Sequence, residues 1–121
     1  MANYYGTTVS SGGKIKKGSS VAINKIIEKY TFGNEGELNV GVEDGRLQVW
    51  GYDSPYAYAE TDEETFDGFL NEVSKYLVEP LIIQEVGSEK CRYVTAFAYI
   101  VKPNKKCVSV DIWELINKKL K

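Results

Sequence analysis

Short stretches of the chain alternate hydrophobic residues with polar or small ones, which is the pattern of a strand with one buried face. The clearest case spans residues 38–49, where two alternating runs flank Glu43-Asp44-Gly45. An Asp-Gly pair between such runs predicts a hairpin with a tight turn. Similar signals predict a second hairpin, from residues 81–86 into residues 91–102. The remaining expected strands are residues 3–9, 56–59 and 107–112.

A longer stretch near the start carries hydrophobic residues at intervals of three and four, the spacing of an amphipathic helix. Either Ser19 or Ser20 can cap this helix, which is expected to end near Phe32 and Gly33. Its apolar stripe consists of Ile23, Ile26, Ile27 and Tyr30.

A second helix is expected over residues 61–77, where Thr61 and Glu64 have the spacing of a capping box. Its apolar stripe consists of Phe66, Phe69, Leu70, Val73, Tyr76 and Leu77. A short C-terminal helix over residues 113–120 also fits the pattern, although it begins without a strong cap.

Taken together, these elements predict one α+β domain over residues 1–121, in the order strand, helix, three strands, helix, three strands. Strands joined by hairpins favour a two-layer fold, with a mainly antiparallel sheet of six to seven strands and two helices packed on one face. The alternative is a small barrel-like sheet that curls around the second helix. A domain of this length can bury a core without disulfide or metal cross-links.

The compartment is expected to be the cytoplasm, because no secretory signal is recognisable and the longest apolar run is too short to span a membrane. The two cysteines, Cys91 and Cys107, fit that expectation. In the predicted hairpin they lie about ten residues apart along the strands, on the order of 30 Å, which is beyond the reach of a disulfide. Both are therefore expected to be reduced.

Charge is unevenly distributed, with a net −12 over residues 31–89 between two basic segments. A clustered acidic segment beside aromatic strands is typical of a surface that binds another protein. The candidate partner-binding residues are Trp50, Tyr52, Tyr56, Tyr58, Glu60, Asp62, Glu63, Glu64 and Asp67. The competing interpretation is that the acids cap a helix and keep the protein in solution, while the aromatic rings pack in the core.

A basic loop before the first helix has the two glycines of a phosphate-binding loop, Gly13 and Gly18, at the motif's spacing. Ser19 stands where that motif requires a lysine, so nucleotide hydrolysis is not expected. Simple anion binding is still compatible with the loop, through Lys14, Lys16, Lys17, Gly18, Ser19 and Ser20. The competing interpretation is a solvated loop, and a pI near 5.2 does not favour a dedicated nucleic-acid binder.

The chain contains no histidine. This excludes Ser-His and Cys-His catalysis and histidine-ligated zinc. No catalytic residue, metal or cofactor is predicted, and a carboxylate-dependent enzyme is retained only as a second alternative to a binding protein.

In organisation, the lysine- and tyrosine-rich chain resembles small uncharacterised α+β proteins carried by bacteriophages and mobile elements, with a helix over residues 61–77 followed by hairpins through Ile112. The resemblance implies a stoichiometric role. The expected function is a non-catalytic inhibitor that blocks a host protein; the alternative is a protein that sequesters a nucleotide, another phosphate-bearing molecule or nucleic acid. No membrane partner is expected. If residues 3–9 form an edge strand, Tyr4 and Tyr5 would favour a homo-oligomer by strand addition.

Overall fold

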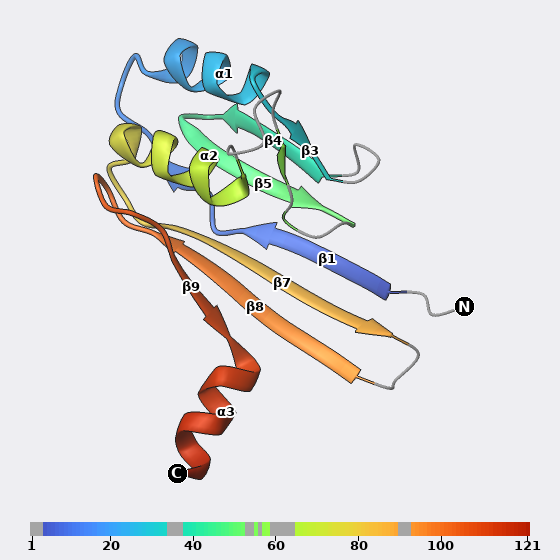
Figure 1. Cartoon of the computed structure of the whole chain (residues 1–121). Coiled ribbons are helices and arrows are strands. Elements are labelled where there is room, and N and C mark those ends of the chain that lie inside the picture. The colour runs from blue at the N-terminus through green and yellow to red at the C-terminus, as the bar shows by residue number, and fades with distance from the viewer. Residues whose placement is uncertain (1–3, 34–37, 53–54, 56, 59–64, 90–92) are drawn as a thin grey trace.

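The computed structural model describes residues 4–33, 38–52, 55, 57–58, 65–89 and 93–121, and it has the predicted α+β fold (Figure 1). Antiparallel strands form the sheets, and helices pack against them. The strands are β1 Tyr4–Ser10, β2 Gly13–Lys14, β3 Thr31–Phe32, β4 Leu38–Glu43, β5 Arg46–Gly51, β6 Ala57–Tyr58, β7 Leu81–Glu89, β8 Tyr93–Val101 and β9 Val108–Asp111. The helices are α1 Ser20–Glu28, α2 Phe66–Val73, a 3-10 turn at Ser74–Tyr76 and α3 Ile112–Leu120.

The main sheet contains seven strands, in the spatial order β4, β5, β1 with β2, β7, β8, β9. β1 and β2 share one edge of β5, where Thr8 pairs with Gly51 and Gly13 pairs with Leu47. The chain takes five steps from Thr8 to Gly13 against four on β5, so one extra residue forms a bulge beside Gly12, whose φ is +77°. β1 therefore lies inside the sheet at Thr8 and Val9, whereas in the described part of the chain Tyr4 and Tyr5 pair with β7 alone, so strand addition at these two residues stays a prediction.

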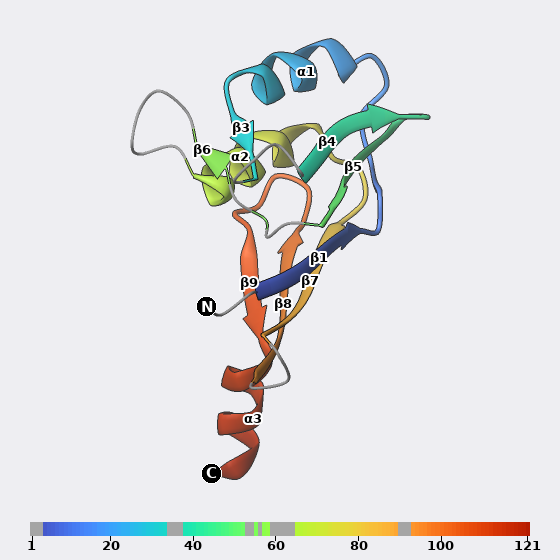
Figure 2. The same ribbon diagram turned by 90° about the vertical axis from the view of Figure 1, so that its right-hand side faces the viewer.

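Helices α1 and α2 lie on the same face of the sheet, over β4, β5 and the adjacent ends of β7 and β8 (Figures 1 and 2). This confirms the predicted two-layer arrangement. The sheet remains open between β4 and β9, so the barrel-like alternative is wrong. The fully buried side chains between the layers include Ile23, Leu47, Val49, Phe69, Leu70, Val73, Leu81, Ile83 and Val101.

An aromatic cluster closes the core beside the short β3–β6 sheet. The rings of Phe32 and Phe69 meet edge to face with centroids 4.9 Å apart, and Tyr30 contacts both. α1 ends at Glu28, earlier than predicted, because Tyr30 and Phe32 then enter this cluster and β3 pairs with β6. The aromatic contacts outweigh the helical spacing of Tyr30.

α2 begins at Phe66, and the Thr65 side chain caps it by accepting a hydrogen bond from the backbone N–H of Gly68. The predicted capping box of Thr61 and Glu64 lies outside the described residues. The regular helix ends at Val73, and a 3-10 turn continues to Tyr76, close to the predicted end.

Both predicted hairpins are confirmed. In the first, Asp44 and Gly45 have φ values of 52° and 72°, as a type I′ turn requires. The second pairs β7 with β8, followed by β9. α3 is also present, and it has the cap that the sequence analysis missed: the Asp111 carboxylate accepts a hydrogen bond of 2.7 Å from the backbone N–H of Trp113. Within the described part of the chain, no helix is long and apolar enough to cross a membrane.

Candidate interaction surface

In the described part of the chain, the face of the main sheet opposite α1 and α2 meets a helix only beside β8 and β9, where α3 begins. Side chains alternate between the two faces along each strand, so Thr8 and Ile83 are buried under the helices, whereas Val9 and Ile82 point the other way. We call this second surface the open face. Its described side chains on β1, β5, β7, β8 and β9 are Thr7, Val9, Arg46, Gln48, Trp50, Ile82, Gln84, Val86, Ala96, Ala98, Ile100, Val108 and Val110.

Strand register aligns these residues in rows across the sheet. One row runs over five strands from Trp50 through Val9, Gln84 and Ala98 to Val110. Large apolar side chains on this face are well exposed, with 53% of Trp50, 54% of Val9, and 57% each of Val86 and Val108 accessible to solvent.

Among the open-face residues named above, only Arg46 carries a charge; it lies beside Gln48 at the start of β5 and pairs in register with Glu43 of β4. Water-facing sheet surfaces normally carry polar and charged side chains, which discourage association. The open face instead combines exposed valine, isoleucine and tryptophan with neutral Gln and Thr. That composition matches the core of a protein–protein interface, where charged residues are depleted.

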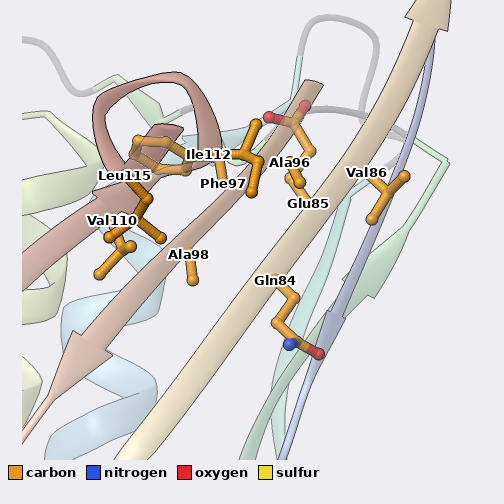
Figure 3. A pocket seen from close by; sticks show the side chains of 9 residues that line it. All are labelled: Gln84, Glu85, Val86, Ala96, Phe97, Ala98, Val110, Ile112 and Leu115. Carbon is orange, nitrogen blue, oxygen red and sulfur yellow. The ribbon is translucent and has the colours of Figure 1, made fainter. Parts of the chain in front are cut away.

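Small residues leave two hollows in the open face. One hollow has a volume of about 190 Å³ and lies over the β4–β5 hairpin. It forms because Gly41 has no side chain to fill the space beside Gln48 and Trp50. The other measures about 230 Å³ and lies where α3 meets the strands (Figure 3). It is lined by Gln84, Glu85, Val86, Ala96, Phe97, Ala98 and Val110 of the strands and by Ile112 and Leu115 of α3.

α3 itself presents an uncovered apolar stripe. The helix extends from the end of β9 beyond the sheet, away from α1 and α2 (Figures 1 and 2). None of its residues is buried. Its apolar side chains are Ile112, Trp113, Leu115, Ile116 and Leu120.

The structure divides the predicted partner-binding residues among different surfaces. Trp50 lies on the open face, and Tyr52 follows β5 with 79% of its surface exposed. Asp67 lies in the first turn of α2, on the helix-covered side, so it does not share a surface with Trp50. Tyr58 lies in β6, but its side chain is outside the described part of the structure. Tyr56, Glu60, Asp62, Glu63 and Glu64 also lie outside the described residues.

Asp67 belongs to a small polar cluster that the sequence did not indicate. Its carboxylate accepts a hydrogen bond from Tyr99, and its carbonyl oxygen lies 3.9 Å from the Cys107 sulfur. Burial and the Asp67 charge raise the pKa of both the Tyr99 hydroxyl and the Cys107 thiol. Both groups therefore keep their protons at neutral pH, which makes them poor nucleophiles. Only strand pairing, which brings β8 and residue 107 beside α2, reveals this cluster.

In the basic loop, the structure groups some of the predicted anion-binding residues and separates others. Lys16, Lys17, Gly18 and Ser20 line a hollow of about 470 Å³ beside the start of α1. Lys14 lies in β2 and does not line it.

Ser19 is buried, and its hydroxyl donates to the carbonyl oxygen of Lys16 at 2.7 Å. The backbone N–H groups of Lys16 and Ser19 also donate within the protein, to the carbonyl oxygens of Tyr76 and Lys16. Part of the hydrogen-bonding capacity that anion binding would use is therefore already occupied.

Titratable groups do not assemble into a metal site: in the described ranges, no three His, Cys, Asp or Glu side chains lie close enough to hold an ion.

Comparisons of the chain with protein-family models, with curated proteins and with solved structures give no match. The function is therefore argued from the surfaces of this protein alone.

Proposed function

We propose that this chain is a non-catalytic protein-binding module that holds its partner against the open face. The supporting observation is the charge-free row of exposed side chains that runs from Trp50 across five strands to Val110. Contiguous exposed apolar patches on soluble proteins commonly mark interaction sites. Tryptophan is among the residues that contribute most to binding when a partner covers them.

The side chains near this surface favour holding a partner over transforming it. Apart from Arg46 and Glu43 beside the β4–β5 turn, the described side chains of the open face offer amide, hydroxyl and hydrocarbon groups. The one described cluster that combines a thiol, a phenol and a carboxylate, at Cys107, Tyr99 and Asp67, keeps its first two groups protonated. Stoichiometric blocking of the bound protein is therefore the mode of action that we propose.

Paired affinity captures from a cell lysate test the proposal, with wild type, Trp50→Ala and Ile82→Lys as baits. Val21→Lys is the matched control, because Val21 is an apolar side chain on α1 that is 65% exposed and far from the open face. We expect one partner that wild type and V21K retain and that both open-face variants lose. Removing a central tryptophan should cost at least about 2 kcal/mol of binding, roughly a 30-fold loss of affinity.

The proposal fails if no protein is retained by wild type, or if W50A and I82K retain the partner as well as V21K does. Circular dichroism of each variant shows that the sheet is intact. Because Trp50 and Ile82 are both exposed, their substitution leaves the core unchanged.

Anion binding at the hollow beside Lys16 and Lys17 is the second candidate, favoured by the polar lining that includes Ser20 and Asn24. Heat-shift measurements with ATP, GTP and inorganic phosphate test it. Stabilisation by any of them that is lost in Lys16→Ala/Lys17→Ala would support this function, and unchanged unfolding temperatures would exclude it for these anions.

A further inference from the structure

α3 carries an apolar stripe that the described part of its own domain covers only at the base of the helix, where Ile112 and Leu115 line a hollow beside the strands. The exposed fraction is 44% for Leu115, 37% for Ile116 and 78% for Leu120, although these side chains occupy one side of the helix. A nine-residue helix with an uncovered stripe is marginal in water, because most helical stability in proteins comes from packing of the apolar face. We infer that α3 packs antiparallel against α3 of a second copy of this chain, in a two-fold homodimer.

The charges along α3 argue for a second copy and for the antiparallel direction. Asp111 and Glu114 lie at the start of the helix, and Lys118, Lys119 and Lys121 lie at its end. A parallel pair would place acid beside acid and lysine beside lysine. An antiparallel pair instead brings Glu114 of each copy beside Lys118 of the other and opposes the two helix dipoles favourably.

The two-fold arrangement also fills the hollow at the base of α3. If the axis passes beside Ile116, Leu120 of the second copy lies opposite Ile112, and Glu114 lies opposite Lys118. Ile112 lines the 230 Å³ hollow together with Val86 and Val110 of the open face (Figure 3). Leu120, the most exposed apolar residue of α3, is thereby placed at the hollow of the other copy. The two-fold axis repeats this contact, so both hollows are filled.

The dimer contact must extend beyond the two α3 helices to bury enough surface. A helix of nine residues is about 13 Å long, and two of them cannot bury the roughly 1,200 Å² that a stable interface needs. The end of the open face next to α3 supplies additional apolar surface through Val86, Val108 and Val110. The dimer therefore covers the Val110 end of the five-strand row, whereas the Trp50 end remains accessible to a different protein.

Light scattering coupled to size-exclusion chromatography of the full chain tests the inference. Wild type should have twice the mass of one chain at micromolar concentration. Ile116→Glu/Leu120→Glu should have the mass of a single chain, while Val21→Glu, at an exposed apolar site on α1, should remain a dimer. A wild-type protein that is monomeric throughout the micromolar range overturns the inference, as does an I116E/L120E variant that stays dimeric.

Charge reversal tests the direction of the helices. Glu114→Lys and Lys118→Glu should each dimerise more weakly than wild type, because each places like charges together. When the two variants are mixed, with one of them isotope-labelled, native mass spectrometry should show predominantly heterodimers. A change in the stability of α3 within each chain cannot explain such a preference, because each chain in the mixture still carries its own single substitution. If the single reversals dimerise as well as wild type does, the antiparallel contact is wrong.

This inference and the proposed function involve opposite ends of the open face, and separate variants test them. Trp50→Ala should remain dimeric, and I116E/L120E should still capture the partner. Loss of the dimer and loss of partner capture can therefore be observed separately.

Discussion

Cys107 is placed where its thiol is difficult to ionise. It is partly buried, its backbone N–H donates to the Asn71 side chain at 2.8 Å, and the Asp67 charge lies nearby. Burial contributes most to raising the thiol pKa, the Asp67 charge adds to it, and a backbone hydrogen bond opposes both. Thiolate is the reactive form of cysteine, so Cys107 is protected chemically as well as sterically.

We expect Cys107 to react with iodoacetamide more slowly than an exposed cysteine at mildly alkaline pH. Asp67→Asn should lower the thiol pKa and speed alkylation, because the thiolate fraction at a pH below the pKa rises as the pKa falls. Peptide mass spectrometry separates Cys107 from Cys91. Asp44→Asn, at an exposed turn residue, is the control. An unchanged rate in D67N would show that the carboxylate does not act on this thiol.

Glu72 connects the two core helices. One carboxylate oxygen accepts from the Lys29 ammonium at 2.6 Å, and the other accepts from the Tyr30 hydroxyl at 2.6 Å. Burial alone would raise the pKa of Glu72, but the two hydrogen bonds and the charges of Lys29 and Lys75 outweigh it, and the pKa is lowered. The charged Glu72 carboxylate therefore stabilises the folded protein at pH values above the unfolded-state pKa of Glu72. This stabilisation is lost as the pH falls through the folded-state pKa of Glu72.

Glu72→Gln should lower the free energy of unfolding by about 1 kcal/mol at neutral pH. The difference from wild type should shrink as the pH falls below the normal range of a carboxyl group, because wild-type Glu72 then becomes neutral too. Urea unfolding at several pH values measures both effects, and Glu28→Gln on α1 serves as the exposed control. A difference that persists unchanged in acid would contradict the assigned role of the charge.

At the scale of elements, Asp111 has two roles: it ends β9, and its side chain caps α3. The apolar spacing alone indicates the helix, but the capping group is easily counted as part of the preceding strand. An aspartate in extended conformation immediately before a helix is the usual geometry of a cap.

Asp111→Ala should cost about 1 kcal/mol of α3 stability. Hydrogen exchange should become faster for the amides of α3 while β7 and β8 remain unchanged. Asp111→Asn keeps an oxygen acceptor and should behave almost like wild type. Equal exchange rates in D111A and D111N would show that the cap is dispensable.

Elements with local patterns could be predicted from the sequence, whereas β2 and β3 could not. The two hairpins carry alternation and turn residues within a single window, and β6 falls within the strand expected over residues 56–59. β2 and β3 have two residues each, and they exist only because Gly13 meets Leu47 and Phe32 meets Ala57 across long stretches of chain. Such pairs leave no periodic signal, since a strand of two residues has no repeat.

For the molecule as a whole, burial separates two sets of aromatic residues. Phe69 is fully buried and contacts Phe32 and Tyr30, whereas Trp50 is half exposed on the open face. Phe69→Ala should destabilise the protein by about 3–5 kcal/mol. Trp50→Ala should cost less than about 1 kcal/mol, because its ring lacks a covering layer. Denaturant unfolding of both variants measures the contrast, and comparable losses would contradict the two-layer arrangement.

The sequence did not indicate which face of β7 and β8 is exposed. In β7 and β8, neighbouring residues such as Ile82 and Ile83, or Ile100 and Val101, are apolar on both sides of the strand. Runs of this kind are typical of strands that are covered on both faces. Which face the helices cover depends on where α1 and α2 pack, and that is determined by tertiary contacts.

The central place of β1 also affects how fast the protein folds. Thr8 pairs with Gly51 on one side and with Glu85 on the other, so β1 must find two partners that are made much later in translation. Hairpins β4–β5 and β7–β8 can each close from neighbouring residues, but the sheet becomes continuous only when β1 inserts between them. Sheets with such distant pairings fold slowly, on the order of milliseconds to seconds. A nascent chain therefore carries residues 4–7 unpaired until β7 has left the ribosome, whereas Thr8 and Val9 can pair with β5 earlier.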